Sequence, residues 1–284
     1  MTDAASAFLE SRFQLPDGTE LFLRDWLIDG ETAPCVVLLH GLGEHCGRYL
    51  HVATQLHALG YSVRTFDQRG HGQSGGARGD APTLTAHSDD AEILIRDFAH
   101  RCATRPLLFG HSMGGLFAAR IATESKIPLS GLILSSPALA LRLTVFDKFL
   151  LSALGAIAPH FAVATGLKTS YLSHDPVVVA AYEKDPLVHS KISASLLNSM
   201  LAAIEYSQNH APILTVPTLL LVAEDDHLIN PQGSRDFLAN LPSNLSTAHF
   251  YSGFYHELFH EVGAAQVFSD VHDWLATRHF MVET

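Results

Sequence analysis

The sequence predicts an α/β fold in which a mostly parallel central sheet is flanked by helices and interrupted by one helical insertion. Short apolar runs alternate with segments whose apolar residues recur at helical spacing. The runs CVVLL (35–39) and PLLFG (106–110) are apolar at successive positions, as expected of parallel strands buried on both faces. The alternation stops over residues 138–210, where helical patches occur without a clear strand. Together these observations predict one α/β core divided by an inserted cap.

The expected elements follow one another along the chain. Residues 8–14 and 20–27 flank a Pro-Asp-Gly turn, which is typical of a hairpin. Further strands are expected at 35–41, 61–67, 106–110, 130–137, 216–224 and 245–251, and helices at 48–59, 86–104, 112–125, 231–240 and 261–280. The predicted organisation is a first core segment (1–137), a helical cap or lid (138–210) and a second core segment (211–284).

The composition excludes several classes of protein. Of 284 residues, 47% are hydrophobic and 17% are charged, which is typical of a globular chain. The net charge of −11 argues against nucleic acid as a partner, because phosphate binding needs a basic face. Three cysteines make no disulfide framework, and residues 1–18 lack the pattern of a signal peptide. We therefore expect a protein of the reducing cytoplasm.

The segment GHSMG (110–114) matches G-x-S-x-G, the motif that places a serine on a strained turn between a strand and a helix. A second match, GQSGG (72–76), lies in a loop of glycines and charged residues, with no strand before it and no apolar helix after it. This context favours Ser112 as the nucleophile. The alternative for Ser112 is a helix N-cap, which is a common use of serine.

A serine nucleophile requires two backbone N–H donors for the negative charge that develops on the substrate oxygen. Met113 follows the nucleophile and supplies one of them. The loop HGLGEH (40–45) follows an early strand, and Leu42 within it is the expected second donor. The loop could instead be a plain glycine-rich turn. A dinucleotide loop is disfavoured, because Cys46 stands where G-x-G-x-x-G requires glycine.

Chain order selects the acid and the base, since this architecture arranges its triad as Ser…Asp…His. The strand that follows the insertion ends in Glu224, Asp225 and Asp226, and we favour Asp226 over Asp225 as the acid. His256 follows the next strand in a loop, where a base is expected. The imidazole would take the serine proton, and the carboxylate would fix its tautomer.

The stretch HELFH (256–260) also matches H-E-x-x-H, the signature of zinc proteases. The extended form of that motif needs a third histidine where Gln266 stands, and a zinc site needs a third protein ligand. We therefore interpret Glu257 and His260 as the start of the last helix, and we expect no metal.

Six segments together resemble the monoacylglycerol lipase and lysophospholipase branch of the α/β-hydrolase fold, a branch that also includes proline aminopeptidases. They are LLHGLGEHCGRY, FDQRGHGQSGG, GHSMGG, YEKDPL, AEDDHL and FYHELFHE, and the likeness extends from about residue 10 to residue 278. The resemblance implies Ser112, Asp226 and His256 as the triad, Leu42 and Met113 as oxyanion donors, and Glu44, Arg48 and Tyr182 near the polar end of the substrate. The chain departs from the lipases at Phe259, where they carry a second histidine, and His260 comes one position later.

The predicted cap suits a lipid substrate. Residues 149–167 carry no charge, and burying an acyl chain contributes about 0.8 kcal/mol per CH₂. Pro159 and His160 interrupt this stretch, so we do not expect a membrane span, although the cap could touch lipid surfaces transiently. Alternatively, these residues only pack on the core.

The resulting hypothesis is a serine hydrolase that cleaves carboxylic esters of lipids, such as monoacylglycerols or lysophospholipids, through an acyl-enzyme. It requires no metal and no organic cofactor. Two alternatives stay open: a proline-type aminopeptidase of the same fold and a non-catalytic, ligand-binding relative. The sequence gives no signal for an oligomeric state.

Overall fold

The computed structural model describes residues 8–29, 33–142, 155 and 157–277. Its main sheet has eight strands in the order β1-β2-β4-β3-β5-β6-β9-β10. The strands are β1 (Leu9–Gln14), β2 (Glu20–Trp26), β3 (Cys35–Leu39), β4 (Ser62–Phe66), β5 (Leu107–His111), β6 (Gly131–Ser135), β9 (Thr218–Ala223) and β10 (Ser246–Tyr251). The β1–β2 and β2–β4 pairs are antiparallel, whereas all pairs from β4 to β10 are parallel. The predicted hairpin and parallel sheet are thus confirmed.

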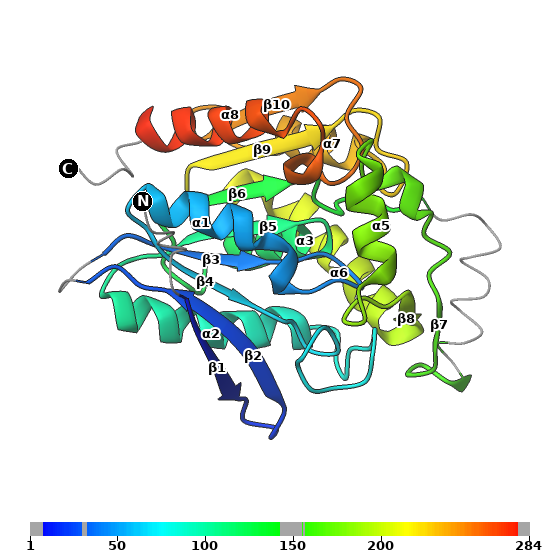
Figure 1. The fold of residues 1–284 in the computed structure, drawn as a ribbon. Helices are drawn as coiled ribbons and strands as arrows, with labels where there is room; N and C mark the ends of the chain where they lie inside the picture. The colour runs from blue at the N-terminus through cyan, green and yellow to red at the C-terminus, as the bar shows by residue number, and fades with distance from the viewer. Residues whose placement is uncertain (1–7, 30–32, 143–154, 156, 278–284) are drawn as a thin grey trace.

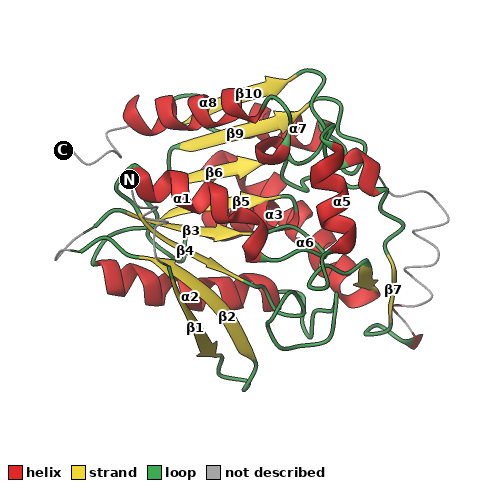
Figure 2. Cartoon of the chain, in the orientation of Figure 1, coloured by secondary structure: helices red, strands yellow, loops and turns green. Residues whose placement is uncertain are grey.

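Helices cover both faces of this sheet (Figures 1 and 2). They are α1 (Leu50–Ala58), α2 (Ala86–Cys102), α3 (Met113–Glu124), α7 (Gln232–Asn240) and α8 (Ala264–Thr277). The apolar sides of α1 and α8 form one core cluster with the sheet, and those of α2, α3 and α7 form another. Strand β3 supplies both clusters, because its successive side chains point to opposite faces. This explains why its sequence is apolar throughout.

The last helix begins later than predicted. It starts at Ala264, and residues 278–280 of the predicted helix lie outside the described residues. Residues 256–263 form a loop with a short 3₁₀ turn, η4 (Leu258–His260), so Glu257 and His260 do not start the helix. The interpretation of these two residues as its first turn was therefore wrong. Glu257 instead binds Arg48 with both carboxylate oxygens, which holds its side chain at the pocket.

The described part of the segment between β6 and β9 lies over the end of the sheet at which the parallel strands terminate (Figure 1). Its described elements are β7 (Ala162–Ala164), η2 (Thr169–Tyr171), α5 (Pro176–Lys184), β8 (Lys191–Ser193), α6 (Ala194–His210) and η3 (Ala211–Ile213). Strands β7 and β8 pair with each other, although the sequence predicted only helices here. Three residues per strand are too few for period-two alternation to be visible in sequence. The cap boundaries remain a prediction, and residues 143–154 and 156 lie outside the described part.

Backbone hydrogen bonds attach the cap to the core away from its ends. The N–H of His189 donates to the carbonyl of Gly43 (2.8 Å), and that of Ser193 donates to Gly79 (2.8 Å). A Cβ atom at Gly43 or Gly79 would lie 2.3 or 2.0 Å from a carbonyl oxygen of this cap segment, so both positions require glycine. Within the described residues, no helix is long and apolar enough to cross a membrane.

Candidate active site

Ser112 occupies a sharp turn between β5 and α3. Its backbone has φ 53° and ψ −118°, a conformation that a residue with a side chain adopts only under strain. Its N–H donates to the carbonyl of Ser135 on β6 (3.0 Å), which holds the turn in place. The strand therefore ends one residue before Ser112 and the helix begins one residue after it, as the motif predicts.

The glycines of the motif are required by close backbone packing. A Cβ atom at Gly110 would lie 2.4 Å from the carbonyl oxygen of Gly114. A Cβ atom at Gly114 would lie 2.4 Å from the carbonyl oxygen of Leu39 and 2.5 Å from that of His40. Because these contacts are to backbone, the neighbours cannot move aside cheaply. The two glycines let α3 approach β3 and β5 closely enough to present Ser112.

We expect Gly114→Ala to lower the free energy of unfolding by about 3 kcal/mol, the upper end of the usual cost of overpacking. Urea unfolding of the purified variant measures this. The matched control is Gly155→Ala, where the nearest atom to an added Cβ among the described residues would be Asn198 Nδ2, at 3.5 Å. Equal urea midpoints for the two variants would contradict the packing argument.

Three side chains that are distant in sequence meet at this turn. His256 Nε2 lies 2.9 Å from Ser112 Oγ, and His256 Nδ1 lies 2.6 Å from Asp226 Oδ2. The other carboxylate oxygen of Asp226 accepts the N–H groups of Leu228 (2.8 Å) and Ile229 (3.0 Å). Asp226 follows β9 and His256 follows β10, so both reach Ser112 from the same end of the sheet. The adjacent Asp225 is exposed.

Burial and charge act in opposite directions on this pair. Burial alone would raise the pKa of Asp226, but His256 and the backbone donors outweigh it, so that pKa lies below its ordinary value. Burial would lower the pKa of His256, but Asp226, followed by Glu257 and Glu44, raises it above 6.5. The ionised form of Asp226 is therefore favoured over its neutral acid, and this carboxylate stabilises the imidazolium form of His256.

The second G-x-S-x-G match is part of the core structure. Ser74 is buried, its Oγ accepts the N–H of Phe22 (2.8 Å), and it donates to the carbonyl of Asp67 (2.5 Å). Both hydrogen-bonding roles of the hydroxyl are thus used within the fold. Ser74 thus has a structural place in the core, and Ser112 stays the predicted nucleophile.

The two expected oxyanion donors lie on either side of Ser112 in the fold: Leu42 lines the pocket with it, and Met113 follows it in the chain. Met113 is the first residue of α3, so its N–H has no acceptor within the helix. Leu42 lies in the loop after β3 and lines the pocket together with Ser112. An added Cβ at Gly41 would lie 3.2 Å from Ser112 Cβ, which shows how closely this loop passes the serine.

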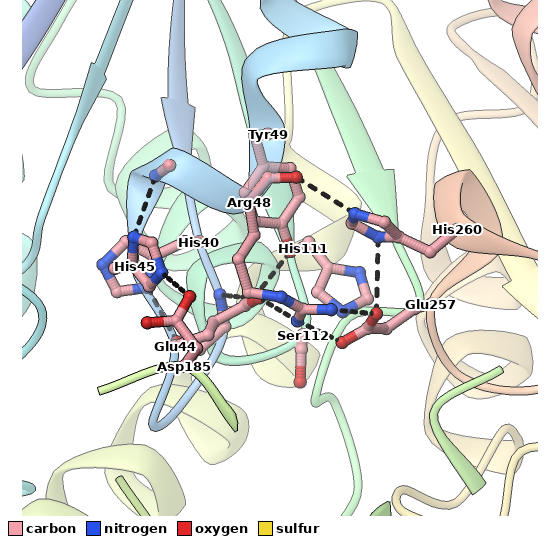
Figure 3. Close-up of polar contacts among 12 residues, drawn as sticks. His40, Glu44, His45, Arg48, Tyr49, His111, Ser112, Asp185, Glu257 and His260 are labelled. Carbon is pink, nitrogen blue, oxygen red and sulfur yellow. Dashed lines mark hydrogen bonds and ion pairs between the residues drawn. The ribbon is translucent and has the colours of Figure 1, made fainter. Parts of the chain in front are cut away.

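The structure also brings the three predicted substrate-binding residues together, with one residue that sequence analysis missed. Glu44 and Tyr182 line the pocket, whereas Arg48 lies behind them with its guanidinium 4.7 Å from the Tyr182 ring centroid. Glu257 lines the pocket beside them and binds Arg48 (Figure 3). No local pattern signals this pairing, because Arg48 and Glu257 are 209 positions apart.

The geometry disfavours the zinc interpretation. His256 precedes η4 and directs Nε2 to Ser112, whereas His260 Nε2 donates to the carbonyl of Arg48 (3.0 Å). The two histidines therefore do not share one helical face, as H-E-x-x-H sites require. Across the part of the chain that the structure describes, no three His, Cys, Asp or Glu side chains gather as a metal site.

Ser112 opens into a pocket of about 450 Å³ between the core and the cap. Cap residues contribute an apolar wall made by Leu167, Leu172, Ile192, Leu197 and Met200. Polar side chains that also line it include Glu44, Tyr182 and Glu257, and the cations Arg142 and Lys168. A largely apolar compartment with a few polar groups is typical of a small-molecule site.

Comparison with known proteins identifies the family. The model of the serine aminopeptidase S33 family matches residues 30–263. The chain belongs to this family. A monoacylglycerol lipase of Mycolicibacterium smegmatis is 34% identical over 94% of this chain and 97% of its own length. The crystal structure of the Paleococcus ferrophilus monoacylglycerol lipase is 33% identical, with a TM-score of 0.82, over 91% of this chain and 99% of that one.

The family also includes longer proteins. An uncharacterized abhydrolase domain-containing protein of Dictyostelium discoideum is 32% identical over 98% of this chain, which spans 29% of that protein's length. The predicted α/β-hydrolase fold and family are confirmed by these relatives. They also confirm the predicted enzyme class, a carboxylic ester hydrolase.

Proposed function

We propose that this chain cleaves carboxylic esters of lipids through an acyl-enzyme on Ser112. The observation that carries the proposal is the hydrogen-bonded series Ser112–His256–Asp226, with contacts of 2.9 and 2.6 Å, at the bottom of a largely apolar pocket. Such a series activates a hydroxyl that is otherwise a weak nucleophile at neutral pH.

In the proposed reaction, Ser112 Oγ attacks the acyl carbonyl while His256 Nε2 takes its proton. The N–H groups of Leu42 and Met113 donate to the oxyanion of the tetrahedral intermediate. His256 then gives the proton to the departing alcohol, which leaves the acyl group on Ser112. Water attacks this ester by the same proton transfers and releases the fatty acid. Asp226 keeps the Nδ1 proton in place and stabilises the imidazolium.

The lining of the pocket supports a monoacylglycerol as substrate. Its apolar wall fits an acyl chain, and the hydroxyl of Tyr182 offers a hydrogen-bonding group to a small alcohol. Two relatives named monoacylglycerol lipase, each about a third identical, support the same substrate. Charged side chains of both signs line the pocket, because Arg142 and Lys168 accompany Glu44 and Glu257.

The cap also supports transient contact with a lipid surface. Three of its large apolar side chains, Ile157, Phe161 and Val177, are 85%, 63% and 73% exposed and so available to such a surface. The net charge of −11 disfavours anionic surfaces, so we propose contact with neutral or zwitterionic lipid.

The experiment is fatty-acid release by the purified protein from esters that share one acyl chain. We expect fatty acid to be released from monoacylglycerol, and the corresponding anionic lysophosphatidic acid shows whether Arg142 and Lys168, which also line the pocket, accept an anionic head group. Lysophosphatidylcholine separates the effect of head-group size from that of charge.

Two controls accompany this panel. Prolyl and other aminoacyl amides test the peptidase alternative, and their faster cleavage would overturn the lipid proposal. Binding of a monoacylglycerol without release of acid would support the non-catalytic alternative instead. Sedimentation with phosphatidylcholine vesicles, compared with vesicles of an anionic lipid, tests the surface contact of the cap.

A further inference from the structure

Arg48 connects two loops that are far apart in the sequence (Figure 3). Its Nη1 donates to Glu44 Oε2 (2.7 Å) and to Glu257 Oε1 (2.5 Å), and its Nη2 donates to Glu257 Oε2 (2.7 Å). The side chains of Arg48, Glu44 and Glu257 are 9%, 4% and 3% exposed. The two-pronged contact fixes the direction as well as the distance between Arg48 and Glu257.

Each end of this ion bridge is attached to a part of the proposed catalytic machinery. Glu44 Oε1 accepts the N–H of Gly41 (2.6 Å) and the hydroxyl of Tyr49 (2.6 Å). Gly41 immediately precedes Leu42, the proposed oxyanion donor. Glu257 immediately follows His256, so the carboxylate that binds Arg48 shares its backbone with the proposed base. The bridge therefore joins the oxyanion loop to the loop of the base.

The bridge is shielded from solvent. The ring of Tyr182, from α5 of the cap, lies over the guanidinium of Arg48 at 4.7 Å. His260 Nε2 donates to the carbonyl of Arg48 (3.0 Å) from the opposite loop. Burial would raise the pKa of Glu257, but Arg48 outweighs it and the carboxylate is favoured. A charge in such an environment acts strongly on its neighbours, because little water screens it.

His256 experiences this charge. The titratable groups that face it are Asp226 from the loop after β9, His111 from β5, Glu44 from the loop after β3 and Glu257 from its own loop. His111 is buried, and burial and the neighbouring His256 hold its pKa well below 6.5, so it is neutral at neutral pH. After Asp226, Glu257 is the next largest influence that favours the imidazolium form of His256.

We propose that Glu257, acting through Arg48, is a positioning residue that sets the orientation of His256 and keeps the oxyanion loop aligned with it. This inference rests on the proposed function. Glu257 lines the pocket, but both of its oxygens bind Arg48, so its carboxylate belongs to the frame of the site and does not serve as a head-group ligand. A misplacement of about 1 Å in such a frame costs on the order of 10²-fold in rate.

The test compares Glu257→Gln and Arg48→Lys with wild type in monoacylglycerol hydrolysis from pH 5 to pH 9. We expect kcat to fall about 10²-fold in both variants while KM changes by less than about threefold. Activity requires neutral His256, so kcat/KM falls as the pH decreases through its raised pKa, which lies above 6.5. Losing the Glu257 charge lowers the pKa of His256, so this fall in kcat/KM on the acid side of the pH profile, the acid limb, moves to lower pH. Arg48→Lys retains both carboxylates and leaves the limb near its wild-type position.

Asp25→Asn is the matched control. Asp25 is 1% exposed and accepts Arg64 Nε (2.8 Å) and Nη2 (2.7 Å) through both oxygens, away from the pocket. This variant should lose stability without shifting the acid limb. The inference is overturned if Glu257→Gln folds and keeps the kcat and the acid limb of wild type. It is also overturned if only KM changes.

If Glu257→Gln fails to fold, the kcat of Arg48→Lys decides the question. If neither variant folds while Asp25→Asn does, the bridge is a folding requirement and the positioning role is wrong. Inactive wild-type protein would contradict the proposed function itself. If wild type is active and both variants have its kcat and pH profile, only the proposed role of the bridge is contradicted.

Discussion

Ser112→Ala is expected to lower kcat for ester hydrolysis by about 10⁶-fold, the loss typical when a triad nucleophile is removed. Without Oγ there is no acyl-enzyme, and the oxyanion donors and the pocket alone cannot replace it. Substrate should still bind, because the apolar wall of the pocket is intact. Stopped assays that follow fatty-acid release over hours would measure the residual rate.

The control for this variant is Ser74→Ala, in the second G-x-S-x-G segment. The hydroxyl of Ser74 joins Phe22 to Asp67, so its loss should lower stability and leave kcat near wild type. A serine-directed fluorophosphonate should label wild type and Ser74→Ala, but not Ser112→Ala. Retained hydrolysis in folded Ser112→Ala would place the nucleophile elsewhere.

Asp226→Asn is expected to lower kcat by about 10⁴-fold while the protein remains folded. The asparagine amide can donate to His256 Nδ1, which moves the imidazole proton to Nε2. His256 could then no longer accept the Ser112 proton across the 2.9 Å contact. KM should change little, since Asp226 lies behind the histidine. Steady-state kinetics at pH 7 to 9, with circular dichroism for the fold, test this.

Asp225→Asn is the matched control, because Asp225 is adjacent in sequence but exposed. It should keep nearly full activity. If the two substitutions had equal effects, the assignment of the acid to Asp226 would be wrong, and the hydrogen bonds from Leu228 and Ile229 would have only a structural role.

The sheet could be predicted from the sequence, and so could the meeting of Ser112, Asp226 and His256, because each of these residues follows a strand. Parallel strands end at one edge of the sheet, so residues placed just after them converge there whatever their separation in sequence. The same rule placed Leu42 beside Ser112. It depends only on element order and side-chain periodicity, both of which are visible in a single sequence.

Other features depend on packing that no local pattern records. The pairing of β7 with β8 rests on contacts between segments that are short and weakly patterned. Glu257 was interpreted as the start of the last helix once the zinc motif had been set aside. Its binding to Arg48 arises only when two distant loops meet at the same edge. Long-range ion pairs of this kind require the fold to be known first.

The backbone hydrogen bonds from His189 and Ser193 of the cap to Gly43 and Gly79 of the core affect how this enzyme could be engineered. The cap is a continuous insertion and so invites exchange between homologues to alter chain-length preference. His189 binds the carbonyl of Gly43, however, and Gly43 adjoins Leu42. A transplanted cap that lacks an extended stretch at 189–193 would release the oxyanion turn as well as reshape the pocket. The cap therefore cannot be exchanged independently of its contacts with Gly43 and Gly79, and chain-length selectivity and catalytic rate would change together.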